Sequence, residues 1–109
     1  MNFGEYQKLS RETVIYPDPG NNFVYPTLGL AGEAGEVSDK VSKIIRDKGG
    51  KIDEESRKEV AHELGDLLWY MSQLATELSL SLDEVASCNI EKLKSRLERK
   101  QLHGNGDHR

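Results

Sequence analysis

Two pairs of acidic residues have the types and the spacing to bind a metal ion. Glu33 and Glu36 are three positions apart, and so are Glu63 and Asp66. On a helix, residues three apart lie on the same face, so each pair would present two carboxylates in one direction. Two such pairs that faced each other would repel unless a cation lay between them. Oxygen ligands without His or Cys suit Mg²⁺, for which Mn²⁺ can substitute.

The two acidic pairs are placed symmetrically about a Gly-Gly sequence. Gly49 and Gly50 break a helix and permit a tight reversal of the chain. Two helices joined by a short turn are antiparallel neighbours, so residues equally far from the turn lie at the same height. Glu36 and Glu63 are equidistant from the turn, and so are Glu33 and Asp66. We therefore predict that all four carboxylates converge on one metal site.

The segments that carry the acidic pairs also resemble each other, and each contains a glycine at the equivalent position. These glycines are Gly35 and Gly65, and both fall inside a helical pattern. Glycine inside a helix costs about 1 kcal/mol relative to alanine, so its presence needs a reason. Close approach of two helix backbones supplies one, and we predict such an approach at both positions.

The elements that would position these side chains follow from apolar residues with a helical period. The period predicts helices over about 27–46 and 53–78. A shorter first helix, with Asn2 as its cap, precedes a proline-containing loop over residues 16–26. A last helix runs from the capping box of Ser81 and Glu84 to about Leu102. No segment reads as a strand, so the predicted fold is all-α: a four- to five-helix bundle built on an antiparallel helical hairpin.

Length, charge and cysteine content exclude several classes of protein. The chain has 109 residues, a net charge of −4 and one cysteine, Cys88. This predicts one domain over 1–109, divided into an N-terminal helix and loop (1–26), a helical core (27–102) and a tail (103–109). No apolar run is long enough to cross a membrane, a lone cysteine forms no internal disulfide, and an acidic chain is poorly suited to bind a nucleic acid polymer. We expect a cytoplasmic protein.

The last predicted helix supplies positive charge. Asn89, Lys92 and Arg96 lie at i, i+3 and i+7, beside its apolar stripe. Cations at this spacing can hold a polyphosphate whose oxygens also bind metal, although on their own they would more often be solvated. Tyr70 follows Asp66 by one turn and could pack on a nucleotide base, though a place at the core edge is commoner for tyrosine.

Taken together, the spacing of these residues resembles the MazG-like branch of the all-α nucleoside triphosphate pyrophosphohydrolases. The resemblance covers about Tyr25 to Arg109. It implies Mg²⁺-dependent cleavage of a nucleoside triphosphate between the α and β phosphates, which yields the monophosphate and pyrophosphate. In this resemblance the metal ligands are Glu33, Glu36, Glu63 and Asp66, and the substrate-binding residues are Asn89, Lys92 and Arg96. Many members have a further glutamate where this chain has Gly32, so the general base stays open. If the reaction needs a protein base, Glu36 or Glu63 is the nearest candidate for this catalytic role.

Two other functions remain compatible with the sequence. One is a non-catalytic helical module whose acidic patch binds a basic partner or a metal. The other is a hydrolase of the same all-α group that acts on dUTP or on a phosphoribosyl-linked nucleotide. A small domain also cannot cover all its apolar side chains, notably Leu68, Trp69 and Ala75. We therefore predict a homodimer or homotetramer in which two chains shape each nucleotide pocket, with Trp69 in a subunit interface or a base pocket.

Overall fold

A computed structural model of the chain describes residues 1–99, and within that range it contains four helices and no strand. The all-α class predicted from the sequence is confirmed. A fifth helix is absent from the described part of the chain, and the tail segment 103–109 lies outside it. The helices are α1 (Phe3–Arg11), α2 (Val24–Lys48), α3 (Glu54–Glu77) and α4 (Leu82–Glu98).

Three helices begin at the capping residues that the sequence predicts. The side chain of Asn2 accepts a hydrogen bond from the backbone N–H of Glu5 at 2.8 Å. Asp53 does the same for Ser56 at 2.8 Å, and Ser81 for Glu84 at 3.3 Å. Each bond satisfies a donor that has no partner inside the helix, so these short-range signals fix the helix starts.

Helix α2 begins three residues earlier than predicted, at Val24 instead of Thr27. Pro26 therefore lies in the first turn of the helix, where its missing N–H removes no helical bond. The side-chain oxygen of Asn22 accepts a hydrogen bond from the backbone N–H of Tyr25 at 3.0 Å and so helps to start the helix. The predicted loop is correspondingly shorter.

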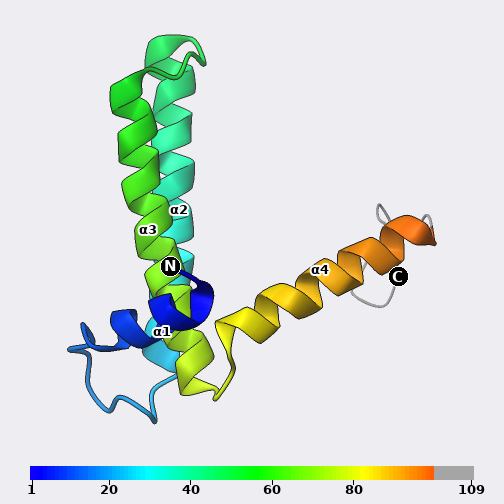
Figure 1. Cartoon of the computed structure of the whole chain (residues 1–109). Helices are drawn as coiled ribbons and strands as arrows, with labels where there is room; N and C mark the ends of the chain where they lie inside the picture. Colours follow the sequence, from blue (N-terminus) through cyan, green and yellow to red (C-terminus); the bar gives the residue numbers. More distant parts are fainter. Residues whose placement is uncertain (100–109) are drawn as a thin grey trace.

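Helices α2 and α3 form the longest packed unit of the chain, here called the hairpin. Figure 1 shows α2 running to the turn and α3 returning beside it. The turn uses Gly49 and Gly50 with φ of 60° and 80°, a left-handed conformation that glycine adopts without strain. The Lys48 ammonium closes the turn by donating to Asp53 at 2.9 Å and to Ser56 at 2.8 Å.

The predicted close approach at the two mid-helix glycines is wrong. An added Cβ at Gly35 or Gly65 would meet nothing within 4 Å. Close packing occurs instead at Gly29, where the ring of Tyr70 occupies the place that a Cβ would take. The glycine that permits contact between α2 and α3 thus lies nearer the open end of the hairpin.

The N-terminal segment is fastened to α3 by buried polar groups. Ser10 and Ser72 share a hydrogen bond of 2.8 Å, and the Gln73 amide donates to Ser10 at 3.0 Å. Beyond α1, the loop over residues 12–23 is held by Glu77, which accepts from the backbone N–H groups of Gly20 and Asn22. These contacts join parts of the sequence that are more than fifty residues apart.

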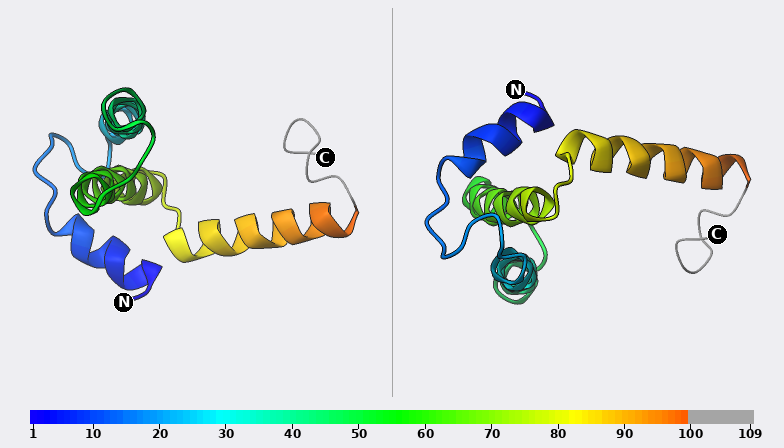
Figure 2. Two further views of the ribbon diagram at one scale, coloured as in Figure 1. Left: turned by 90° about the horizontal axis from the view of Figure 1, so that it is seen from above. Right: turned by 90° about the horizontal axis from the view of Figure 1, so that it is seen from below.

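Helix α4 leaves the hairpin and projects from it, as Figures 1 and 2 show. Its first residue is fixed against α1, because the side-chain oxygen of Gln7 accepts a hydrogen bond from the backbone N–H of Leu82 at 2.9 Å. Further along α4, the apolar side chains of Val85, Ile90 and Leu97 are exposed. The expected bundle therefore does not close within one chain, because α4 packs on α1 and does not cover the hairpin.

The apolar side chains that remain exposed differ from those predicted. Ala75 is buried, and the indole N–H of Trp69 donates to the Thr13 hydroxyl at 2.7 Å within the same chain. One group of exposed apolar side chains lies near the turn of the hairpin, around a hollow of about 350 Å³. Its exposed apolar lining consists of Val41, Ile45, Ile52 and Leu64.

No helix among residues 1–99 combines the length and the apolar character that crossing a membrane requires.

Candidate metal centre

Three carboxylates meet halfway along the hairpin. Glu33 comes from α2, while Glu63 and Asp66 come from α3. Each offers one oxygen, and these three oxygens all lie within 4.8 Å of one another. The first two residues are half-buried and Asp66 is exposed, so the group opens to solvent on one side. We call these three residues the carboxylate cluster.

The fourth predicted ligand, Glu36, is not part of the cluster. Its residue is exposed, and it is absent from the set of converging oxygens. Residues three apart differ by ~60° around a helix, so such a pair can converge, as Glu63 and Asp66 do, or diverge, as Glu33 and Glu36 do, according to how the helix is oriented. The charge of Glu36 is still close enough to contribute to the raised pKa of Glu33.

Glu33 has the most perturbed environment in the cluster. Burial raises its pKa, as do a hydrogen bond with Glu63 and the negative charges of Asp66, Glu63 and Glu36. Its Oε2 atom is buried and has no hydrogen-bond partner among the described residues. An unpaired buried carboxylate oxygen is costly, and a cation would relieve that cost. The all-oxygen donor set and this partnerless atom therefore fit Mg²⁺ or Mn²⁺.

Tyr70 lies beside the cluster, toward the open end of the hairpin. Burial raises its pKa, and the neighbouring Tyr25 and Glu33 raise it further. The Tyr70 ring contacts Trp69 edge-on at 5.1 Å between centroids and is tilted against Tyr25 at 6.4 Å. Tyr25 is 44% exposed. An aromatic surface thus adjoins the carboxylates on this side.

The predicted substrate-binding residues of α4 are not brought to the carboxylate cluster of the same chain. Asn89 and Lys92 line a hollow on α4 together with Leu80 and Ser81, and Arg96 is buried on the same helix. The chain turns away at Ser79, whose φ of 57° lies in the left-handed region. That turn directs α4 away from α2 and the cluster (Figure 1).

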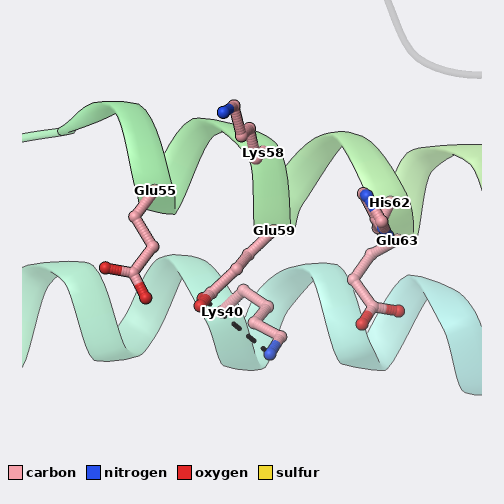
Figure 3. A pocket seen from close by; sticks show the side chains of 6 residues that line it. All are labelled: Lys40, Glu55, Lys58, Glu59, His62 and Glu63. Carbon is pink, nitrogen blue, oxygen red and sulfur yellow. Dashed lines mark ion pairs between the residues drawn. The ribbon is translucent and has the colours of Figure 1, made fainter.

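A cation that the sequence analysis missed lies on the other side of the cluster. Lys40 of α2 lines a hollow of about 280 Å³ that also includes Glu63 (Figure 3). Its ammonium forms an ion pair of 3.9 Å with Glu59. Its position in the sequence could have indicated this place, because Lys40 follows Glu33 by seven residues and so lies two helical turns away on the same face of the helix.

Comparison with known proteins identifies the family of the chain. Residues 26–100 match the sequence model of the MazG nucleotide pyrophosphohydrolase domain. The chain is 44% identical over 114 residues to the Gene 37 protein of Mycobacterium phage L5, and the whole of both chains is covered. No solved structure is significantly similar. Since the domain match spans more than half of the sequence, the chain belongs to the MazG nucleotide pyrophosphohydrolase family.

Proposed function

We propose that this chain is a Mg²⁺-dependent hydrolase that cleaves a nucleoside triphosphate to the monophosphate and pyrophosphate. The observation that carries the proposal is the carboxylate cluster, in which three oxygens lie within 4.8 Å and one buried oxygen of Glu33 has no partner among the described residues. Membership of the family supplies the substrate class. Three carboxylate ligands and no nitrogen or sulfur favour a hard cation over iron or zinc.

The roles of the chain's own residues follow from their positions. Glu33, Glu63 and Asp66 hold the cation. A bound Mg²⁺ lowers the pKa of water and neutralises phosphate charge. Glu36 is exposed one turn from Glu33, so it is free to act as a fourth ligand or, like Glu63, to accept the proton of the attacking water. Water adds to phosphorus, the α–β anhydride bond breaks, and pyrophosphate departs with the bond electrons.

The proposed active enzyme contains at least two chains. In a single chain α4 does not reach the cluster. Its side chains of Val85, Ile90 and Leu97 are exposed, and so are apolar side chains around the hollow near the hairpin turn. A second copy can cover both surfaces, and burial of apolar area drives such association. In that assembly Asn89 and Lys92 of one chain serve the cluster of the other, whereas Arg96 is buried in its own chain. The substrate lies between two chains.

The deciding experiment is a panel of ribo- and deoxyribonucleoside triphosphates with Mg²⁺, with the products separated by chromatography. We expect the monophosphate and pyrophosphate as products. The nucleotide that is cleaved fastest identifies the preferred base, and the panel includes dUTP. Glu63→Gln should lower kcat/KM by at least about a hundredfold. Glu54→Gln is the matched control, because Glu54 is a highly exposed glutamate of the same helix and should leave kcat/KM unchanged.

A non-enzymatic measurement tests the metal site separately. Mg²⁺ should raise the melting temperature of the wild type, because it binds the folded state. It should have a much smaller effect on the double variant Glu33→Gln, Glu63→Gln. Release of inorganic phosphate in place of pyrophosphate, or no turnover of any nucleotide, would contradict the proposed function.

A further inference from the structure

Along the hairpin, three kinds of side chain follow one another in a fixed order. Aromatic rings lie toward the open end, where Tyr70 packs on Gly29. The carboxylate cluster follows, and Lys40 comes next, toward the turn. On α2, Gly29 precedes Glu33 by four residues and Lys40 follows it by seven, which correspond to about 6 Å and about 10 Å of helix.

We propose that Lys40 binds the terminal phosphates of the nucleotide, so that the substrate lies along the hairpin with its base toward Tyr70 and its phosphates toward the turn. This inference rests on the proposed function, since it names the contacts of the same substrate. A nucleoside triphosphate is itself linear, with the base at one end and the most charged phosphate at the other. The order of side chains on the hairpin matches that polarity.

Lys40 is placed and exposed as this role requires. It is the one residue of α2 among those that line the hollow beside Glu63, and the other lining residues come from α3. In Figure 3, Glu55, Glu59 and Glu63 extend from α3 toward α2, Lys40 meets Glu59, and Lys58 points away from α2. The Lys40 side chain is 32% exposed, so an incoming phosphate can reach its ammonium group.

Glu59, which pairs with Lys40 in this structure, would compete only weakly with a phosphate group for the Lys40 ammonium. The pair with Glu59 has a long N···O distance of 3.9 Å, and the Glu59 side chain is 50% exposed. Exposed ion pairs of this kind contribute little to stability. A terminal phosphate carries more charge and offers more acceptor oxygens than a carboxylate does, so its hydrogen bonds to an ammonium are stronger. Lys40 would therefore exchange Glu59 for phosphate when substrate binds.

Two substitutions with opposite expected signs test this exchange. Binding of an α,β-imido nucleoside triphosphate with Mg²⁺ is measured by calorimetry, because this analogue resists cleavage at the α–β bond. Lys40→Gln should weaken binding by about tenfold, the loss of one charge-assisted hydrogen bond. It should leave binding of the monophosphate unchanged, since the monophosphate lacks the terminal groups. Glu59→Gln should strengthen triphosphate binding, because it removes the competing carboxylate.

The matched control is Lys43→Gln. Lys43 lies one turn further along α2 and pairs with Asp39 at 2.9 Å on the helix surface, so its loss should not change either affinity. If Lys40 serves only as a structural partner of Glu59, Lys40→Gln and Glu59→Gln will lower the melting temperature alike and leave the affinities at the wild-type value. That result overturns this inference while wild-type release of pyrophosphate still supports the proposed function. A wild type that releases no pyrophosphate overturns the proposed function itself.

Discussion

Glu77 offers a sharp test of how the N-terminal segment is held. Its side chain is 0% exposed and accepts hydrogen bonds from the Arg11 guanidinium at 2.8 Å and the Tyr16 hydroxyl at 2.7 Å. It also accepts from the backbone N–H groups of Gly20 at 2.9 Å and Asn22 at 2.7 Å. We predict that Glu77→Gln destabilises the chain strongly at neutral pH and much less in acid. The amide that replaces the carboxylate keeps its size but loses its charge and one acceptor oxygen.

The magnitude follows from the pKa of Glu77. Burial alone would raise this pKa, but the hydrogen bonds from Gly20, Tyr16, Asn22 and Arg11 overcome burial and lower it from 4.5 to about 2. One pKa unit corresponds to ~1.4 kcal/mol, so the ionised carboxylate contributes on the order of 3 kcal/mol to folding. Because the folded pKa is the lower one, this contribution is complete above pH 4.5 and is lost as the pH falls toward 2. By about pH 3, roughly 2 kcal/mol of it is gone.

The assay is urea denaturation followed by circular dichroism at pH 7 and pH 3, in wild type and variant. Other carboxylates also titrate in this range, so the informative quantity is the difference in unfolding free energy between the two proteins. We expect that difference to fall from about 3 to about 1 kcal/mol between pH 7 and pH 3. Glu12→Gln, which alters an exposed glutamate near the same loop, should show no such change. A difference for Glu77→Gln that is the same at both pH values would refute the reasoning.

Two further predictions concern packing and assembly. Gly29→Ala should lower the unfolding free energy, measured by urea titration, by ~1–3 kcal/mol, because the added methyl group would overlap the Tyr70 ring. Gly35→Ala should raise the unfolding free energy by up to about 1 kcal/mol, because Gly35 has open space around it. Light scattering at micromolar concentration should give at least a dimer mass for the wild type and a lower mass for Ile45→Glu, whose side chain is 63% exposed in a single chain. A monomeric wild type with full activity would disprove the assembly.

Features set by neighbouring residues were predictable from the sequence. The caps at Asn2, Asp53 and Ser81 each depend on a side chain that reaches a backbone N–H three residues away. The Gly49-Gly50 turn depends on a backbone conformation that glycine adopts easily. Counting residues from that turn was then enough to bring Glu33 and Asp66 together, because both lie the same number of helical turns from it.

Features set by distant residues were not predictable in this way. Nothing near Glu77 in the sequence indicates that it holds Gly20, which is 57 residues away. The direction of α4 depends on a left-handed conformation at Ser79, a residue type for which that conformation carries no clear sequence signal. The exclusion of Glu36 from the cluster was missed because residues three apart differ by ~60° around a helix, and the sequence does not fix how each helix is oriented about its axis: Glu63 and Asp66 both face the cluster, whereas only Glu33 of its pair does.

The hairpin turn has one more consequence, for the lengths that this chain can tolerate. A residue inserted within α3 between the turn and Glu63 would rotate that carboxylate by about 100° and shift it by ~1.5 Å, which removes it from Glu33. A residue inserted in the exposed turn at 50–52 leaves both helices in phase, because the added length is absorbed outside them. Insertions in the turn therefore leave the carboxylate cluster intact, whereas insertions in the helices disrupt it.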